Sequence, residues 1–315
     1  MTYMVTGGAG FIGSNFLHFL SKKTSEPIVV LDNLTYAGNL GYIPKSRQFA
    51  FEWCDISNED HVLFLFEKYK PKKIWHFAAE SHVDNSIANY RPFLEANVIG
   101  TINLLNASLN IGIEKFHHIS TDEVYGSLEY DDTELFTEET PYDPRNPYSA
   151  SKAASDHYVK TWHNTYDLPY LITNCSNNYG KHQHEEKLIP KLVNRAMNDI
   201  TTFMYGGGQQ VRDWLHVRDH CEAIWSLEKN NIINDQFNIG GSCEMRNIDV
   251  SKKVLDLLKK PYGLIGISDQ RPGQDKRYGM DHAKITATTG WKPTTNFDYG
   301  LRETVSWYLE KWGMM

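Results

Sequence analysis

Short runs of apolar residues alternate with amphipathic segments through the first half of the chain. The runs at 3–6, 28–32, 49–53, 74–78, 116–120 and 170–173 have the length of β-strands. Segments with the apolar spacing of helices lie between them, at 13–21, 60–69 and 93–109. Strands that are apolar throughout and alternate with helices are typical of a parallel sheet covered on both faces. We therefore expect an α/β fold built on a doubly wound parallel sheet.

Glycines at 7, 10 and 13 follow the first predicted strand and open the first helix. Their G-x-x-G-x-x-G spacing is a variant of the dinucleotide fingerprint, which needs a tight turn and a close approach of diphosphate to backbone. Asp32 ends the second strand, where a carboxylate can accept hydrogen bonds from a ribose. Its charge would repel a ribose phosphate, and the next three residues include no arginine. The pattern predicts a Rossmann-like domain that binds NAD rather than NADP.

The regular alternation of predicted strands and helices ends at about residue 175. Three consecutive glycines stand at 206–208, and we predict a short strand at 236–239, a helix at 248–258 and a turn at 271–273. With 315 residues, the chain exceeds the usual size of a single core. We expect residues 1–175 to form the NAD-binding domain, catalytic residues included. Residues 176–315 would mainly form a smaller C-terminal lobe that binds the substrate, with some chain returning to the first domain.

Composition excludes several classes of protein. A net charge of -7 without a basic cluster argues against a nucleic-acid partner. No apolar run approaches the ~18 residues of a membrane span, and no signal peptide precedes the first strand. The four cysteines, at 54, 175, 221 and 243, are widely spaced, which favours reduced thiols over disulfides or a zinc site. We expect a cytoplasmic protein with no membrane partner and no metal.

Two adjacent carboxylates, Asp122 and Glu123, follow Thr121 at the end of the strand predicted at 116–120. Such a pair can remove water from a substrate when one acid protonates a leaving hydroxyl and the other takes a proton from carbon. This requires environments that separate the two pKa values. Because isolated Asp-Glu pairs are more often solvated, the interpretation depends on the rest of the chain.

Tyr148 and Lys152 are four residues apart, so in a helix they lie on one face. A phenol, with an ordinary pKa of about 10, acts as a base near neutrality only if positive charge stabilises the phenolate. Lys152 and the oxidised nicotinamide ring could provide that charge. Tyr69 and Lys73 have the same spacing, but Pro71 stands between them and indicates a helix exit instead.

These motifs resemble those of the extended short-chain dehydrogenases/reductases, and among them the dTDP-glucose 4,6-dehydratases. The matching stretches run almost from end to end, at 5–14, 34–39, 78–84, 120–126, 174–180, 186–190, 211–215 and 238–241. The resemblance implies a lyase that oxidises dTDP-glucose at carbon 4, eliminates water across carbons 5 and 6, and returns hydride to carbon 6. The product would be a 4-keto-6-deoxy sugar, and tightly bound NAD would be regenerated in each turnover.

The resemblance also implies roles for individual residues. Tyr148, paired with Lys152, would accept the proton of the hydroxyl at carbon 4, which Thr121 would hydrogen-bond. Glu123 would remove the proton from carbon 5, and Asp122 would protonate the hydroxyl leaving carbon 6. Residues expected at the cofactor are Gly7, Gly10, Phe11, Ile12, Gly13, Asp32, Asn33, Leu34, Thr35, Asp55, Ile56, Phe77, Ala78, Ala79, Glu80, Ser81, Tyr148, Lys152 and Asn178. Residues expected at the nucleotide sugar are Ser81, Thr121, Asn177, Lys187, Leu188, Tyr205, Arg212, Asn247, Arg271 and Gln274.

Four positions depart from the family's usual pattern. Lys181 and Glu185 stand where prolines are usual, Gln274 where histidine is common, and Ala96 where threonine is common. We expect these changes to affect the grip on the diphosphate and base rather than the chemistry. His182 and His184, in the same loop, lack further ligands at metal-binding spacing. The segments 93–109 and 148–166 could form a homodimer interface, as in the superfamily.

Other functions stay open at this point. UDP-glucose is an alternative substrate, because uracil and thymine differ by one methyl group, worth about 1 to 3 kcal/mol in a pocket. A 4-epimerase or decarboxylase would need the Tyr-Lys pair but no acid pair, and epimerases usually carry a serine-rich segment at 121–123. A non-catalytic NAD or nucleotide-sugar sensor would not need the proton-transfer residues. The pathway, whether to rhamnose or another deoxysugar, also stays open.

Overall fold

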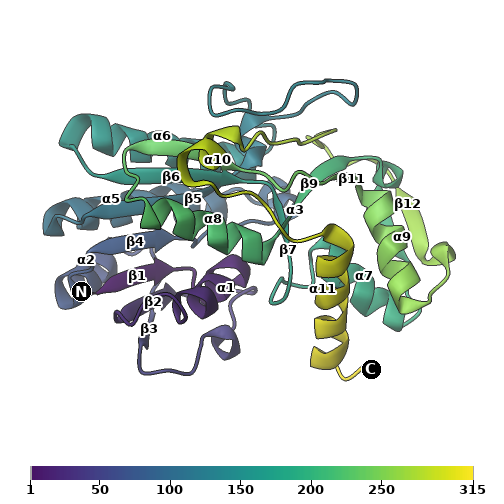
Figure 1. Cartoon of the computed structure of the whole chain (residues 1–315), viewed down its shortest axis with the longest axis horizontal. Helices are drawn as coiled ribbons and strands as arrows, with labels where there is room; N and C mark the ends of the chain where they lie inside the picture. Colours follow the sequence, from purple (N-terminus) through teal and green to yellow (C-terminus); the bar gives the residue numbers. More distant parts are fainter. Residues whose placement is uncertain (1, 315) are drawn as a thin grey trace.

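A seven-stranded parallel sheet forms the centre of the molecule in the computed structural model, which describes residues 2–314 (Figure 1). Its strands, in sheet order, are β10 (Asp235–Ile239), β6 (Tyr170–Cys175), β5 (Lys115–Thr121), β4 (Lys73–His76), β1 (Tyr3–Thr6), β2 (Ile28–Asp32) and β3 (Phe49–Trp53). All neighbouring pairs are parallel. The strand order reverses between β1 and β4, and ligands bind such sheets outside the carboxyl ends at this point. The doubly wound sheet predicted from the sequence is confirmed.

Helices cover both faces of the sheet. The helices α1 (Phe11–Leu20), α8 (Val217–Lys229) and α10 (Ala283–Thr289) pack on one face, and α2 (Glu59–Tyr69), α5 (Gly100–Ile111) and α6 (Pro147–Tyr166) on the other. Alternate residues of one strand enter different cores: Val5 joins the core under α1 and α8, and Met4 the core under α2 and α5. Burial on both sides explains why these strands are apolar throughout.

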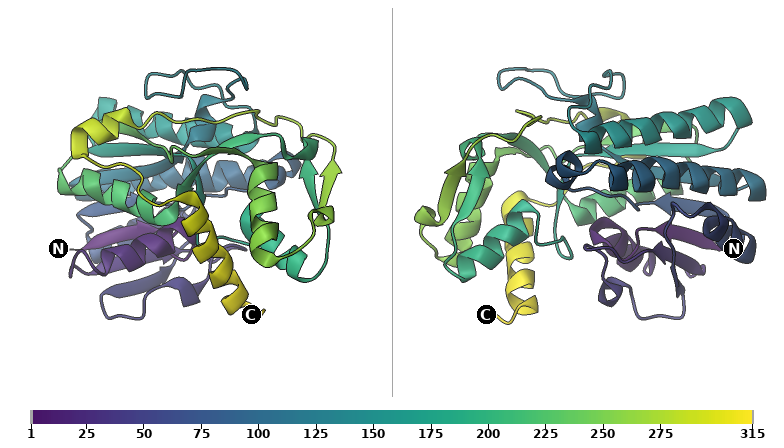
Figure 2. Two further views of the ribbon diagram at one scale, coloured as in Figure 1. Left: turned by 45° about the vertical axis from the view of Figure 1, so that its right-hand side comes forward. Right: turned by 180° about the vertical axis from the view of Figure 1, so that it is seen from behind.

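A smaller lobe lies beside the sheet (Figures 1 and 2). It holds the three-stranded sheet β11-β9-β7, the parallel pair β12-β8 and three helices packed on a core that includes Trp214, Phe297 and Tyr308. The bounds are β7 (Asn177–Tyr179), β8 (Thr202–Tyr205), β9 (Val211–His216), β11 (Glu244–Arg246), β12 (Ile265–Ser268), α7 (Leu188–Met197), α9 (Asn247–Leu258) and α11 (Phe297–Lys311). Between lobe segments the chain returns to the sheet as α8, β10 and α10, so the boundary proposed at residue 175 separates the two parts only approximately.

The helix expected at 93–109 is a helical stretch with a wider turn inside it. It consists of α4 (Arg91–Phe93), the π-helical η2 (Leu94–Ile99) and α5. Within η2, the Asn97 amide donates to the Glu80 carbonyl at 3.0 Å and accepts from the Glu80 N–H at 2.9 Å. The same amide donates to Ser151 of α6 at 2.8 Å. These bonds fix the segment after β4, and π-turns of this kind often stand at functional sites.

The remaining predicted elements agree with the structure to within about two residues. The short elements are α3 (Val83–Ala88) and the 3-10 turns η1 (Leu40–Tyr42), η3 (Asp122–Tyr125), η4 (Gly206–Gly208) and η5 (Tyr262–Leu264). Among residues 2–314, the helices are all too short or too polar to cross a bilayer.

Candidate active site

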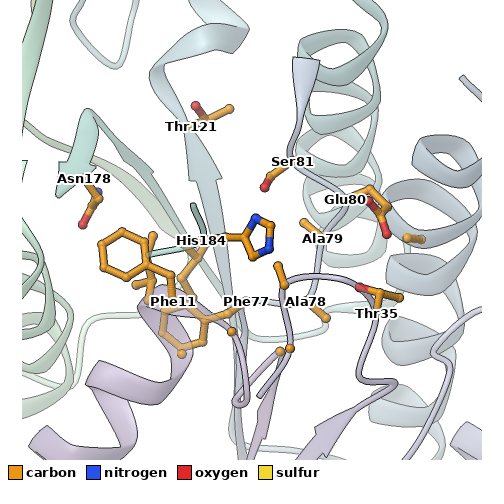
Figure 3. Close-up of a pocket in the computed structure, with 18 of the residues that line it drawn as sticks. Phe11, Thr35, Phe77, Ala78, Ala79, Glu80, Ser81, Thr121, Asn178 and His184 are labelled. Atoms are coloured by element: carbon orange, nitrogen blue, oxygen red, sulfur yellow. The ribbon is translucent and has the colours of Figure 1, made fainter. Parts of the chain in front are cut away.

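A cleft runs between the sheet and the lobe (Figure 3). It consists of a cavity of about 310 Å³ at the carboxyl ends of the strands and a neighbouring cavity of about 260 Å³ against the lobe. Both cavities are lined by Glu123, Asn177, Asn178, Gln183, Glu186 and Lys187. The shared lining makes the two cavities halves of one site: a cofactor half at the sheet and a substrate half at the lobe.

The glycine turn, with glycines at 7, 10 and 13, lines the cofactor half. Gly7 has a φ of 69°, and a Cβ there would lie 2.5 Å from the backbone nitrogen of Ala78. A Cβ on Gly13 would lie 2.2 Å from the carbonyl oxygen of Gly7. Only glycine allows this approach. Because the turn has no side chains at these positions, its backbone is exposed to the cavity. The turn thus fits a dinucleotide diphosphate at the start of α1.

Asp32 supports the glycine turn from the next strand. Its carboxylate accepts the N–H groups of Ala9 and Leu34, each at 2.9 Å, and burial raises its pKa. Leu34 departs from expectation: it has a φ of 53°, and its side chain does not line the cavity. It is the N–H of Leu34 that serves the site, by holding Asp32. The other members of the expected cofactor set all line the cofactor half.

Thr121 places the two acids at the end of β5. It caps η3, where its hydroxyl accepts the N–H of Glu123 at 3.3 Å and donates to Oδ1 of Asp122 at 3.1 Å. Asp122 is buried, and within residues 2–314 its Oδ2 has no hydrogen-bond partner. Oδ2 therefore has an unused hydrogen-bonding capacity in the wall of the cleft, which Asp122 lines.

The environments of the two acids differ. Burial raises the pKa of Asp122 well above its ordinary value, and repulsion from Glu123 raises it further. Burial also raises the pKa of Glu123, while the charge of Arg212 opposes that rise most strongly. A proton shared by such a pair resides preferentially on Asp122, whose pKa is raised the more strongly, and Glu123 ionises first. This arrangement suits an acid paired with a base.

Tyr148 and Lys152 lie one turn apart at the start of α6. The helix begins with a capping box, in which the Asn146 side chain accepts the N–H of Ser149 at 2.9 Å. Burial raises the pKa of Tyr148 well above its ordinary value, with repulsion from Glu123 adding to the rise, and burial lowers the pKa of Lys152 to about 8. Among the described residues, no hydrogen bond joins the phenol to Lys152, whose ammonium donates to the Ile119 carbonyl at 2.9 Å. The phenol is therefore protonated until further positive charge enters the cleft.

The substrate half gathers cations that other groups already hold. Arg271 pairs with Asp84 at 2.9 Å, and Lys187 donates to the Ser81 carbonyl at 3.0 Å. The guanidinium of Arg212 lies 4.0 Å above the ring centre of Tyr278 and is buried. All ten residues expected at the nucleotide sugar line the cleft: Ser81, Thr121, Asn177, Lys187, Leu188, Tyr205, Arg212, Asn247, Arg271 and Gln274. Such a set of cations suits a diphosphate.

Sequence reasoning missed His184, which lies among the labelled side chains of the cofactor half (Figure 3). Its ring stands edge-on to Tyr36 at 5.2 Å between centres, and its Nδ1 is 3.6 Å from Glu186. His184 belongs to the loop in which Lys181 and Glu185 replace prolines. The position of this loop close to the cleft was the one signal that could have identified His184 as a site residue. Within residues 2–314, His, Cys, Asp and Glu side chains form no group of three that could hold a metal.

Comparison with known proteins extends this picture. The profile of a family described as GDP-mannose 4,6 dehydratase matches residues 4–304. A dTDP-glucose 4,6-dehydratase of Haemophilus influenzae is 43% identical over 98% of both chains. The crystal structure of a dTDP-glucose 4,6-dehydratase from Streptomyces venezuelae with NAD bound has a TM-score of 0.95 at 39% identity, covering 100% of this chain and 98% of the other.

Enzymes with other activities share this fold. The UDP-glucose 4-epimerase of Thermotoga maritima has a TM-score of 0.90 at 25% identity, over 99% of this chain and all of the other. Identity of more than 40% over almost the whole length is reached with the dehydratases. The chain therefore belongs to the dTDP-glucose 4,6-dehydratase family of the extended short-chain dehydrogenases/reductases.

Proposed function

We propose that this protein is a hydro-lyase that converts dTDP-glucose to dTDP-4-keto-6-deoxyglucose and water with bound NAD. The observation that carries the proposal is the position of Asp122 and Glu123 at the end of β5, in the same cleft as Tyr148 and with pKa values raised by burial. The relatives' names and the NAD bound in the Streptomyces venezuelae structure support the substrate and the cofactor.

Each side chain has one proton to move. Tyr148 takes the proton of the hydroxyl at carbon 4, to which Thr121 is hydrogen-bonded. Glu123, the acid that ionises first, takes the proton from carbon 5. Asp122, whose pKa burial and the neighbouring Glu123 raise, gives its proton to the hydroxyl that leaves carbon 6. Bound NAD would supply a hydride acceptor for carbon 4 and a hydride donor for carbon 6.

The glycine turn would hold the cofactor diphosphate, and Asp32 the ribose hydroxyls. The lining between them is largely apolar and includes Ile12, Ile56 and Phe77, which suits planar rings. In the substrate half, Arg212, Arg271 and Lys187 would hold the sugar's diphosphate. These assignments to cofactor and substrate remain proposals that mutation can test.

An isotope experiment tests the reaction. Deuterium placed at carbon 4 of dTDP-glucose should be found at carbon 6 of the product, with no net accumulation of NADH. Deuterium that returns to carbon 4 would instead support an epimerase, which has no use for an acid pair. Product formation without any label transfer would contradict both, and absence of turnover would favour a sensor.

A second experiment addresses the nucleotide. The kcat/KM for dTDP-glucose and UDP-glucose should be compared under identical conditions, and we expect dTDP-glucose to be preferred by about 10-fold or more, the value of one methyl group in a pocket. A reversed preference would make the protein a UDP-glucose 4,6-dehydratase. The chemistry derived for the two acids would be unchanged in that case.

We also propose a homodimer formed by α4, η2, α5 and α6. This surface exposes large apolar side chains, among them Tyr90, Leu94, Ile99 and Tyr166. Exposed apolar patches of this kind are typical of interfaces. Sedimentation equilibrium should give twice the chain mass, and Leu94→Asp should shift the protein toward monomer. Glu114→Asp, away from this patch, serves as control.

A cytoplasmic location fits the cysteines. All four are free thiols, and three of them, Cys54, Cys175 and Cys221, are buried. Free thiols suit a reducing compartment. We propose the cytoplasm on this basis, and cell fractionation followed by immunoblotting would test it.

A further inference from the structure

Residues 180–187 form the loop between β7 and α7, and this loop is part of the wall of the cleft. Four of its residues line the cleft: Gln183, His184, Glu186 and Lys187. His182 lines neither half of the cleft, yet its side chain is buried. The reaction proposed above assigns no role to His182.

The imidazole of His182 lies in a stack of aromatic rings. It packs parallel to the ring of Tyr42, with ring centres 4.1 Å apart, and at an angle to the ring of Trp307 on α11, at 5.2 Å. Its Nδ1 lies 2.9 Å from Oγ of Ser14 on α1, in a buried hydrogen bond. Burial lowers the pKa of His182 to about 3, so the stacked ring is uncharged near neutrality. His182 therefore joins the loop to three segments that are far apart in the sequence.

The backbone at His182 is in an uncommon conformation. Its φ of 72° lies in the left-handed region, which residues other than glycine rarely adopt and which persists only where the surroundings determine it. The carbonyl of Lys181, just before it, accepts from the Asn15 side chain of α1 at 3.0 Å. The carbonyl of Gln183, just after it, accepts from the hydroxyl of Tyr308 on α11. The first half of the loop is therefore fixed to α1 and α11.

The second half of the loop reaches the other walls of the cofactor half. Glu186 accepts from the hydroxyl of Tyr36, in the segment after β2, at 3.2 Å. Lys187 donates to the carbonyl of Ser81, in the segment after β4, at 3.0 Å. Figure 3 shows the ring of His184 pointing into the cavity toward Ser81. Since α1 follows β1, the loop is bonded to the segments after β1, β2 and β4, and all three of these segments line the cofactor half.

The proposed function requires that the cofactor stays in the cleft during a turnover. The hydride taken from carbon 4 must return to carbon 6 of the same sugar. Loss of the reduced cofactor between these two steps would leave the sugar oxidised and the turnover incomplete. A loop that encloses the cofactor half would prevent this loss.

We propose that residues 180–187 form a strap that retains NAD throughout the turnover, and that His182 is the positioning residue that locks the strap. The inference rests on the function proposed above. The contacts of Glu186 and Lys187 face the cleft, so a ligand can compete with them. The stack of His182 on Tyr42 lies outside both halves of the cleft, and a bound ligand therefore leaves it intact.

The test measures exchange of the cofactor in the absence of sugar. Protein loaded with NAD is mixed with an excess of deuterium-labelled NAD, and the bound cofactor is followed by mass spectrometry after rapid desalting. His182→Asn removes the ring but keeps a side chain that tolerates a positive φ. Its exchange should be faster than that of the wild type by about 10-fold or more, the value of a lost ring stack. Tyr42→Leu, which removes the other ring, should give a similar increase.

His163→Asn is the matched control. His163 on α6 also combines a ring contact, to Tyr170 at 5.1 Å between centres, with a hydrogen bond to a carbonyl, that of Leu168 at 3.2 Å. It lines neither half of the cleft, so its loss should leave the exchange rate unchanged.

A second readout separates retention of the cofactor from a structural role. Without added NAD, His182→Asn should lose activity during successive turnovers of dTDP-glucose. Saturating NAD should restore its turnover to about the wild-type rate, because the stack touches no reacting group. Turnover that stays slow at saturating NAD would show that His182 supports the fold or the substrate half, and would overturn the strap.

The exchange rates themselves can also overturn the strap. Unchanged exchange in both His182→Asn and Tyr42→Leu would do so, and faster exchange in only one of them would remove the stack as the lock. Should His182→Asn not fold, Tyr42→Leu decides alone, since Tyr42 is only half-buried. A wild-type protein that exchanges NAD faster than it converts dTDP-glucose also contradicts the strap. A wild-type protein that retains NAD but converts no dTDP-glucose contradicts the proposed function and not the strap, because exchange is measured without sugar.

Discussion

The two halves of the cleft are held by different kinds of interaction. In the cofactor half, the backbone is the binding surface, and glycines at 7 and 13 stand where a Cβ would come within 2.5 Å of main-chain atoms. In the substrate half, the groups offered to a ligand are side-chain cations, and they are held by partners that could exchange, such as Asp84 for Arg271. The cofactor half is therefore rigid and fixed in shape, whereas the substrate half can rearrange its ion pairs around a ligand.

The difference explains where specificity resides. The glycine turn and the Tyr-Lys pair would serve any NAD-dependent member of this superfamily, epimerases included. The acid pair and the cations distinguish reactions and substrates, and they come from η3 and from the lobe. Mutations in the two halves should consequently have separable effects on cofactor content and on substrate affinity.

The largest effect is expected in the cofactor half, from Gly13→Ala. The added Cβ would lie 2.2 Å from a carbonyl oxygen of the turn, and such overpacking costs about 3 kcal/mol of folding stability. The turn must open, and NAD should be absent from the purified protein when its content is measured by chromatography after denaturation. Gly263→Ala is the control, because a Cβ there meets no atom within 4 Å. Retention of NAD by Gly13→Ala would show that the turn does not hold the cofactor.

Glu123→Gln changes a residue that lines both halves of the cleft. A glutamine cannot take the proton from carbon 5, so turnover should fall by about 100- to 10,000-fold. Oxidation at carbon 4 does not need this carboxylate, and NADH should therefore accumulate on the enzyme and be visible by its absorbance. Glu185→Gln, an exposed acid of the neighbouring loop, should behave like the wild type. Normal turnover of Glu123→Gln would remove this residue from the mechanism.

Arg271→Met tests the substrate half alone. Loss of a charged contact to a diphosphate should raise the KM for dTDP-glucose by about 10- to 100-fold, corresponding to about 1.5–3 kcal/mol. The NAD content should not change, because Arg271 lines the substrate half and not the cofactor half. Arg246→Met, which removes an exposed arginine paired with Asp249, controls for general loss of charge. An equal fall in NAD content would show that the halves are not independent.

The last prediction concerns the pH dependence of stability and the buried His220 of α8. Burial lowers the pKa of His220 to about 3, whereas in the unfolded chain it has the ordinary value near 6.5. The unfolded state then binds the extra proton first, so His220's contribution is complete above pH 6.5 and is lost as pH falls toward 3. The loss amounts to about 1.4 kcal/mol per pH unit. Urea unfolding across this range should show a shallower decline for His220→Gln than for the exposed control His157→Gln. Equal slopes would contradict the assignment.

Much of the site could be predicted because its signals are local. The glycine spacing, Asp32 at the end of a strand and the Tyr-Lys pair each lie within a few residues, and all of them line the cofactor half. The sheet could be predicted for the same reason, because each apolar strand is a local run of residues. The acid pair needed context, since its raised pKa values arise from burial that no local pattern shows.

Contacts between distant residues escaped prediction. His118 meets Lys152 across 34 positions of the sequence, and Asn97 meets Glu80 through a π-turn that apolar periodicity does not reveal. Leu34 was expected at the cofactor, but it does not line the cofactor half and instead donates its N–H to Asp32. The lobe's strands are three to six residues long, too short to carry a recognisable alternation.

The way the chain returns to the sheet also bears on how the protein unfolds. A fragment that ended at residue 175 would lose β10 from the edge of the sheet, together with α8 and α10, which cover the face under α1. The lobe in turn is built from three separate stretches of chain, 177–216, 244–268 and 297–311. Neither part can therefore melt while the other persists, and thermal unfolding should be a single cooperative transition. Limited proteolysis should either degrade the entire chain or leave it intact, without a stable fragment.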